Sequence, residues 1–179
     1  YGYPEDLDYV EERGAIAGAD PATVSHKAKE RELRQIGSLG SGNHYMEVQW
    51  VEQIYEPDAA DAYGLFPGQV LISIHSGSRA LGHQIGSDYL KVLDAASRKY
   101  SIPIRERELV CAPVDSPEGQ RYLAAVRCGI NGAFANRQAL AHLARVAFHQ
   151  ALLVRPNEIT TLYDIAHNTA KVEEHEVDG

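Results

Sequence analysis

The sequence has few cysteines, no long apolar run and no excess of positive charge. Two cysteines in 179 residues are too few for a disulfide framework and form no CxxC pair. We therefore expect Cys111 and Cys128 to be reduced and to have packing roles. No apolar run approaches the roughly 20 residues that cross a bilayer. The first residues also lack the basic and apolar parts of a signal peptide, so we expect a cytoplasmic protein without membrane anchoring.

The charge balance argues against a protein that coats nucleic acid. A formal net charge of −8 opposes nonspecific binding, which depends on many Lys and Arg contacts to phosphates. Any nucleic acid must therefore be held locally. One basic stretch precedes a glycine-rich loop, and it suits either such local binding or a solvated helix face. It consists of Lys27, Lys29, Arg31 and Arg34.

Apolar spacing and capping residues predict several helices and strands. The composition, 44% hydrophobic and 23% charged, is sufficient for a single core of ordinary size. There is no internal repeat or convincing domain boundary. Helices are expected at residues 21–35, at 80–100 and from 117 to before Pro156. Small residues near position 132 indicate tight packing or a kink in the last of these helices. Strands are expected at 45–55, 70–74, 160–166 and 171–177.

Three short segments, residues 37–44, 75–79 and 163–168, each place a histidine near the end of an expected strand. The neighbouring Gly and Ser residues leave room for a metal ion and an anion. Backbone N–H groups at the start of the helix expected after residue 79 also favour an anion. Together these features indicate a metal site for phosphate chemistry. Histidines at strand ends also commonly cap backbone groups, so a capping role for these three histidines stays open as an alternative to metal binding.

Longer motifs give the sequence a family resemblance over nearly its whole length. It resembles the RtcB-type RNA-splicing ligases, and motifs this long in this order are far more specific than a lone glycine-rich loop. The matching stretches are GSLGSGNHYME (37–47), HSGSRALGH (75–83), APVDSPEG (112–119), FANRQ (134–138) and YDIAHN (163–168) continuing through KVEEH (171–175).

The resemblance implies a GTP- and Mn²⁺-dependent ligase with two manganese ions in the intact enzyme. Such an enzyme joins an RNA 3′-phosphate, or a 2′,3′-cyclic phosphate after hydrolysis, to a 5′-hydroxyl. A histidine is guanylylated, GMP passes to the RNA 3′-phosphate, and the 5′-hydroxyl displaces GMP. The implied fold is α+β, a compact mixed-sheet core with surrounding helices, of which residues 1–179 are the central part of a single catalytic domain. An activating protein is a further expected partner.

The matched motifs also imply roles for individual residues. His44, His75 and His167 are expected as metal ligands, because imidazole binds Mn²⁺ and other divalent ions. Asn43 and Arg79 are expected as catalytic residues that bind phosphate, with Arg79 giving a permanently charged, bidentate grip. The expected GTP-binding residues are Asn43, His44, Tyr45, Met46, Glu47, His167 and Asn168.

Other histidines and polar residues have simpler expected roles. A packing or capping role is favoured for His83, and Arg137 is expected to form an internal ion pair or cap. Asp164 is expected to support His167 or to form a turn. Structural or solvated positions are expected for His26, His142, His149 and His175.

Two parts of the family pattern have no counterpart in this sequence. These are the upstream Asp and Cys ligands and the downstream histidine that becomes guanylylated. We therefore expect the 179 residues alone to form no GMP adduct. Two alternatives stay open: a metal-dependent phosphohydrolase that uses the same histidines to activate water, and a noncatalytic RNA-binding fragment.

Overall fold

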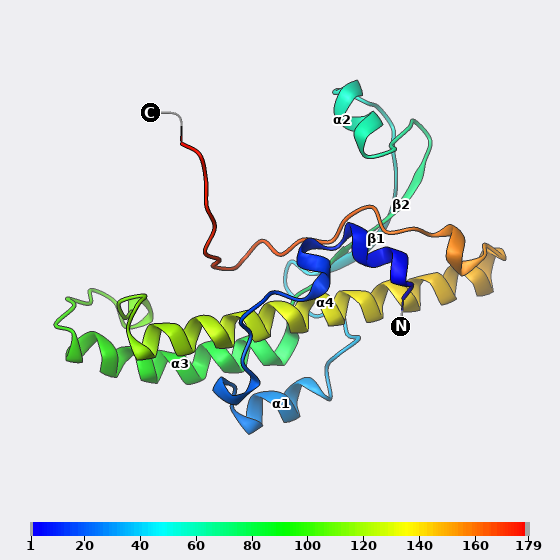
Figure 1. Ribbon diagram of the computed structural model, residues 1–179. Coiled ribbons are helices and arrows are strands. Elements are labelled where there is room, and N and C mark those ends of the chain that lie inside the picture. Colours follow the sequence, from blue (N-terminus) through cyan, green and yellow to red (C-terminus); the bar gives the residue numbers. More distant parts are fainter. Residues whose placement is uncertain (1, 178–179) are drawn as a thin grey trace.

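Two long helices lie side by side at the centre of the molecule, with a small sheet next to them (Figure 1). The computed structural model describes residues 2–177. The helices are α3 (Arg79–Lys99) and α4 (Pro117–Leu152), and the antiparallel strands are β1 (Tyr45–Trp50) and β2 (Val70–His75). The expected α+β class is confirmed. Shorter elements are α1 (His26–Glu32), α2 (Pro57–Ala62) and 3-10 turns at Pro4–Tyr9, Glu11–Gly14, Pro21–Thr23, Arg107–Leu109 and Pro156–Glu158.

Helix α4 begins and ends where local sequence signals place its ends. The Ser116 side chain caps the helix by accepting from the backbone N–H of Gly119 at 3.1 Å, and Pro117 occupies the first turn. Leu153 ends the helix in a left-handed conformation (φ 59°), three residues before Pro156. No described helix is long and apolar enough to cross a membrane.

Small residues let α3 and α4 approach closely, so the packing expected near position 132 is confirmed. A Cβ added at Gly132 would come within 2.6 Å of the Leu81 side chain, and one at Gly129 within 3.9 Å of the Gly82 Cα atom. Helix α4 nevertheless runs from Pro117 to Leu152 without a break. The two helices therefore pack closely beside the end of β2, after which α3 begins, and α4 also contacts β2.

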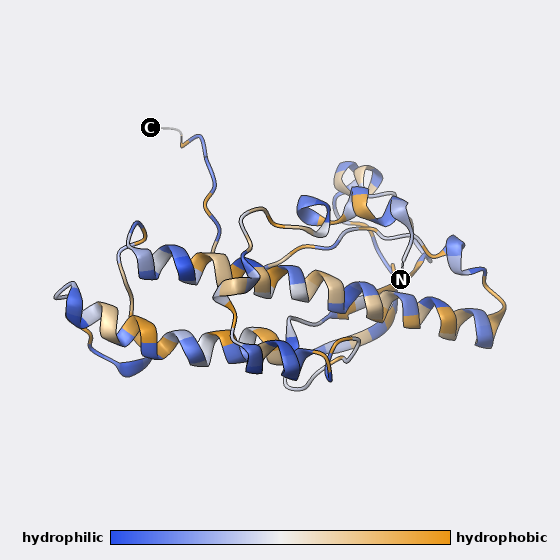
Figure 2. Cartoon of the chain, turned by 60° about the horizontal axis from the view of Figure 1, so that its bottom comes forward, coloured by the Kyte–Doolittle hydropathy of each residue, from blue (hydrophilic) through white to orange (hydrophobic). Residues whose placement is uncertain are grey.

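Two apolar clusters surround these helices. One joins the turn before α1, helix α3 and helix α4; the other packs the N-terminal turns onto the middle of α4. Apolar and polar residues alternate along both long helices, as an amphipathic packing pattern requires (Figure 2). The first cluster contains Val24, Ala28, Ile85, Tyr89 and Ala125, and the second contains Val10, Ile130 and Phe134.

Four expected elements differ from the structure, the first being the strand expected at 45–55, which ends at Trp50. The helix expected at 21–35 is divided into the turn Pro21–Thr23 and α1, because Ser25 caps α1 by accepting from the Ala28 N–H at 3.2 Å. The strand expected at 160–166 is wrong, since only Asp164 forms a bridge, with Val10. The strand expected at 171–177 is also wrong, because that segment has no regular structure. β-branched residues favour strands only where a neighbouring strand is present.

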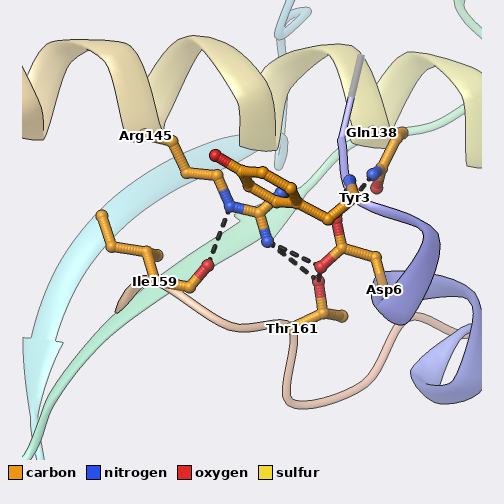
Figure 3. A network of polar contacts seen from close by, with 6 residues as sticks. All are labelled: Tyr3, Asp6, Gln138, Arg145, Ile159 and Thr161. Atoms are coloured by element: carbon orange, nitrogen blue, oxygen red, sulfur yellow. Dashed lines mark hydrogen bonds and ion pairs between the residues drawn. The ribbon is translucent and has the colours of Figure 1, made fainter. Parts of the chain in front are cut away.

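A buried ion pair attaches the N-terminal turn to α4 (Figure 3). The Arg145 guanidinium donates two hydrogen bonds to the Asp6 carboxylate, at 2.8 and 2.7 Å, and the two side chains are only 3% and 5% exposed. Burial by itself would raise the pKa of Asp6. Hydrogen bonds from Arg145 and Thr161, together with those from the Tyr3 N–H and Gln138, instead hold this pKa well below its usual range.

Candidate functional site

The three histidine segments meet where β1 and β2 reach the long helices. His44 directly precedes β1, and His75 ends β2 opposite Tyr45. His167 comes from the irregular segment after α4. The ring centroids of His44 and His75 are 5.5 Å apart, and those of His75 and His167 are 5.0 Å apart. The fold thus brings together three imidazoles that are distant in the sequence.

The two imidazoles of His75 and His167 are arranged as ligands of one ion would be. Their Nε2 atoms lie 3.2 Å apart. Two nitrogens bound to one divalent ion at about 2.1 Å are separated by about 3.0 Å in octahedral and about 3.4 Å in tetrahedral geometry. The pair therefore fits a shared cation. Within residues 2–177, no group of three or more His, Cys, Asp or Glu side chains forms a complete metal site, so further ligands are needed.

Backbone carbonyls of the glycine-rich loop orient two of the rings. The Nδ1 atom of His75 lies 3.1 Å from the Asn43 carbonyl oxygen, and that of His44 lies 3.2 Å from the Leu39 carbonyl oxygen. A carbonyl only accepts hydrogen bonds, which favours a proton on Nδ1 of His75, whereas Nδ1 of His44 also faces Nη1 of Arg79, a group that only donates, at 3.4 Å. With that proton on Nδ1, Nε2 of His75 has the lone pair that binds a metal, and this atom faces Nε2 of His167.

Arg79 lies beside His44 at the first position of α3. Its backbone adopts a left-handed conformation (φ 49°), which is strained for a residue with a side chain. Its Nε donates to the Ser38 hydroxyl at 3.2 Å, and its Nη1 lies 3.4 Å from Nδ1 of His44. The arginine therefore faces the glycine-rich loop and the histidines, and it is available to bind an anion there.

Gly40 makes this close approach possible. Its φ is 116°, and an added Cβ would come within 2.3 Å of both Arg79 Nη1 and His44 Nδ1. At Gly42, which also has a positive φ of 74°, nothing lies within 4 Å of such a Cβ. Both positions favour glycine because of their backbone conformation. Only at Gly40 would a side chain also collide with Arg79 and His44.

Glu32 lies behind Arg79 and caps the same helix. Its Oε2 accepts a hydrogen bond from the backbone N–H of Leu81 at 3.1 Å. Burial raises the pKa of Glu32, although this hydrogen bond and the nearby Arg79 charge act in the opposite direction. The Glu32 side chain therefore helps to fix the first turn of α3, which carries Arg79.

The expected GTP-binding residues of β1 point to opposite sides of the strand. Tyr45 and Glu47 share one face with His75, because Tyr45 and His75 are cross-strand partners, while Met46 points to the other face. The Tyr45 and His75 rings meet edge to face with centroids 5.5 Å apart. Asn43 and Asn168 are exposed next to the histidines. The nucleotide-binding roles of these residues stay predictions.

Residues of α4 support the site from below. The expected internal ion pair of Arg137 is confirmed, since its Nε donates to Asp164 at 2.6 Å, and its Nη1 donates to the Ser76 carbonyl at 3.1 Å. Burial raises the pKa of Asp164, and the Arg137 charge opposes this shift. Sequence reasoning missed the role of Asn136, which is fully buried. Asparagine has a low helix propensity, so its presence in the interior of a long helix was the available sign of a specific role.

Three of the remaining histidines have partners elsewhere in the chain. His149 is at the end of α4, where its Nδ1 is 3.1 Å from the Val154 carbonyl oxygen. His26 contacts Glu30, and His175 contacts Glu173, at exposed positions. Cys111 and Cys128 are free cysteines, and the packing role expected for Cys111 is wrong because this residue is exposed. Burial raises the pKa of Cys128, as expected of an unreactive packing residue.

Three neighbouring imidazoles, an adjacent arginine and the N-terminus of α3 form a set of groups suited to metal-assisted chemistry on phosphates. The comparisons with known proteins agree with this class. The family model "tRNA-splicing ligase RtcB" matches residues 1–179, and the chain belongs to this family.

Similar proteins bear the same name. The chain is 52% identical over 181 residues to the tRNA-splicing ligase RtcB of Pyrococcus abyssi, and 51% identical over 181 residues to that of Thermococcus kodakarensis. It is 48% identical to that of Methanocaldococcus jannaschii. Each match covers 100% of the chain, but only 20%, 38% and 19% of these relatives, respectively.

Proposed function

We propose that residues 1–179 are the central part of a single catalytic domain in an RNA ligase. The intact enzyme joins RNA 3′-phosphate or 2′,3′-cyclic phosphate ends to 5′-hydroxyl ends through a histidine–GMP intermediate, with GTP and Mn²⁺. Family membership and the names of relatives such as that of Pyrococcus abyssi support RNA joining. A cytoplasmic setting also belongs to the proposal.

The observation that carries the metal part of this proposal is the pair of Nε2 atoms, 3.2 Å apart, on His75 and His167. In the proposal these two residues and His44 hold Mn²⁺. The metal, when bound, neutralises charge on the phosphoryl group that is transferred. The remaining coordination positions are filled by ligands from outside this chain.

Other residues of the chain bind and orient the reacting phosphate in this proposal. Arg79 donates a charged pair of hydrogen bonds to a phosphate oxygen, from the side occupied by the glycine-rich loop. The Asn43 amide adds a hydrogen bond without adding charge. Tyr45, Glu47 and Asn168 border the same region and form part of the GTP surface.

The decisive experiment mixes the intact enzyme with GTP, Mn²⁺ and RNA pieces that end in a 3′-phosphate and a 5′-hydroxyl. The proposal predicts a joined RNA and a GMP adduct on the protein. Release of inorganic phosphate without joining would instead identify a metal-dependent phosphohydrolase. RNA binding that is indifferent to Mn²⁺ and to His75→Ala, without any reaction, would identify a noncatalytic RNA-binding protein.

The chain by itself is proposed to be inactive in this assay. The histidine that accepts GMP and two metal ligands are expected outside the matched residues, and the chain spans 38% of the Thermococcus kodakarensis relative. Incubation of residues 1–179 with radiolabelled GTP and Mn²⁺ should leave the chain unlabelled. Stable label on the chain would contradict this part of the proposal.

A further inference from the structure

Arg79 has a backbone conformation that residues with side chains rarely adopt. Its φ is 49°, and a conformation of this kind persists only where the surrounding structure holds it. Two buried side chains from different helices contact the backbone close to Arg79. Asn136 contacts the carbonyl of Gly77, two residues before Arg79, and Glu32 contacts the N–H of Leu81, two residues after it. A buried contact therefore lies on each side of the strained residue.

Asn136 uses its whole amide to join two loops of the candidate site. Its side chain is 0% exposed. Its Oδ1 accepts from the Gly37 N–H at 2.7 Å, and because an N–H only donates, this contact fixes which end of the amide is the oxygen. Its Nδ2 then lies 3.0 Å from the Gly77 carbonyl oxygen and 3.0 Å from the Ser76 hydroxyl, with the Ser38 carbonyl oxygen at 3.2 Å. One amide thus connects the loop before β1 to the residues that lead into α3.

The same amide is also connected to the partner of the Arg79 side chain. Arg79 Nε donates to the Ser38 hydroxyl at 3.2 Å, and the Ser38 carbonyl oxygen is one of the atoms that face Asn136 Nδ2. Asn136 therefore contacts the chain near both ends of the arginine, at Gly77 beside its backbone and at Ser38 beside its guanidinium. Loss of this amide would let the two ends move relative to each other.

Glu32 fixes the chain after Arg79. It is the last residue of α1 and is 9% exposed. Its Oε2 accepts from the Leu81 N–H at 3.1 Å, whereas its Oε1 is buried without a hydrogen-bond partner among the described residues. The neighbouring Arg31 donates from Nη1 to Gln84 Oε1 at 2.7 Å, which is a second link between the two helices. The end of α1 is therefore attached to α3 immediately after Arg79.

We propose that Asn136 and Glu32 are positioning residues, which together hold the left-handed backbone of Arg79 and so direct its guanidinium toward the glycine-rich loop. Neither residue forms a hydrogen bond or ion pair with the three histidines within the described part of the chain. Both act through Arg79. The consequence for RNA joining rests on the proposed function, in which Arg79 binds phosphate, whereas the consequence for the conformation of Arg79 does not.

The chain offers matched variants for a test. Asn131, also on α4, uses its amide to bind the backbone of Ile16, with Oδ1 accepting from the N–H at 2.8 Å and Nδ2 donating to the carbonyl at 3.3 Å. Asn131→Ala therefore removes a similar pair of hydrogen bonds without a contact to the chain around Arg79. Glu32→Gln keeps a side-chain oxygen that can accept from the Leu81 N–H, whereas Glu32→Ala removes it.

The first measurement follows the Nε–H group of Arg79 by ¹H–¹⁵N NMR in the intact enzyme, with its signal assigned by its loss in Arg79→Lys. The hydrogen bond to Ser38 should protect this proton from exchange with water. Asn136→Ala and Glu32→Ala should each speed the exchange by about 10-fold, the factor that corresponds to loss of one hydrogen bond. Asn131→Ala and Glu32→Gln should exchange as the parent does. If one alanine variant does not fold, the other decides, because each removes the contact on only one side of Arg79. A folded Asn136→Ala or Glu32→Ala enzyme with the parent's exchange rate would overturn the inference.

RNA joining, measured with excess intact enzyme in single turnovers, separates this inference from the proposed function. A side chain that acts through Arg79 should have little further effect once the guanidinium is removed, whereas independent effects multiply. We expect Asn136→Ala to slow joining by about 10-fold in the parent and by less than about 2-fold in Arg79→Ala. Multiplied losses would overturn the inference. Faster proton exchange in Asn136→Ala, together with normal joining by Arg79→Ala, would uphold the inference and count against the phosphate-binding role of Arg79.

Discussion

The Nε2 atoms of His75 and His167 lie 3.2 Å apart, although the two residues are separated by 92 positions. One comes from the end of a strand and the other from an irregular segment that follows the longest helix. Arg137 helps to hold them together, because it donates to the Ser76 carbonyl and to Asp164. The pair therefore depends on α4 as well as on the segments that carry the histidines.

Loss of either member of this pair should abolish RNA joining in the intact enzyme. His75→Ala and His167→Ala each remove one of two nitrogens that fit a single cation, so metal-dependent activity should fall to the background of the assay. His149→Ala is the control, since that ring forms its hydrogen bond with the Val154 carbonyl at the end of α4, away from the cluster. Joining of 3′-phosphate and 5′-hydroxyl RNA is the measurement. Equal joining by all three variants would disprove the assignment.

Substitution of two nearby glycines should separate strain from disruption of the site. Gly40→Ala and Gly42→Ala both place a side chain at positive φ, which costs about 1 kcal/mol. Only Gly40→Ala also pushes a Cβ into Arg79 and His44. We expect a larger loss of stability for Gly40→Ala in chemical denaturation, because the steric clash adds to the backbone strain that both variants share. RNA joining by the intact enzyme should fall at least about 10-fold for Gly40→Ala, because the loss of a charged hydrogen bond alone costs about 1.5 kcal/mol or more. Equal activity of the two variants would contradict the claim that a side chain at position 40 disturbs Arg79 and His44.

Removal of the buried Arg145 charge should be strongly destabilising. Arg145→Met leaves the Asp6 carboxylate buried without its partner, and breaking a buried pair in this way costs about 3–5 kcal/mol. Arg155→Met is the control, because its ion pair with Glu158 is exposed. Denaturant unfolding of the chain gives the free energy of unfolding for both. Similar values for the two variants would show that the buried pair is unimportant.

The same ion pair should make the chain sensitive to acid. The pKa of Asp6 is lower in the folded chain than in the unfolded chain, so the unfolded chain binds more protons as the pH falls. The stabilisation is complete above the ordinary aspartate range and should decrease below about pH 4. Unfolding free energies measured from neutral to acid pH should fall more steeply for the parent than for Asp6→Asn. Identical slopes would refute the depressed pKa.

Local signals predicted the two long helices well. Ser116 and Pro117 mark the start of α4, and the apolar repeat after position 80 marks α3, because caps and periodicity are short-range properties. The strand expected at 160–166 failed for the opposite reason. A strand needs a neighbour, and the backbone N–H of Ala166 instead donates to the Glu11 side chain at 2.8 Å. Sequence composition carries no information about such distant partners.

The candidate site was predictable in its residues but not in its support. Motifs singled out His44, His75 and His167, and the fold brings their rings together in neighbouring pairs. The positioning contacts of Asn136 were not predictable, since Gly37 is 99 and Ser76 is 60 residues away from it in the sequence. Whether an interior helical asparagine contacts a loop or solvent is decided by packing alone.

Addition of Mn²⁺ to the ¹⁵N-labelled intact enzyme, followed by NMR of its histidine side chains, tests the metal site most directly. Mn²⁺ broadens the signals of groups close to it, and the account predicts early, selective broadening of His44, His75 and His167. The signals of His26 and His149 should remain sharp at the same Mn²⁺ concentration. Broadening of all these histidines together, or none at His75 and His167, would contradict a metal site formed by the three converging segments.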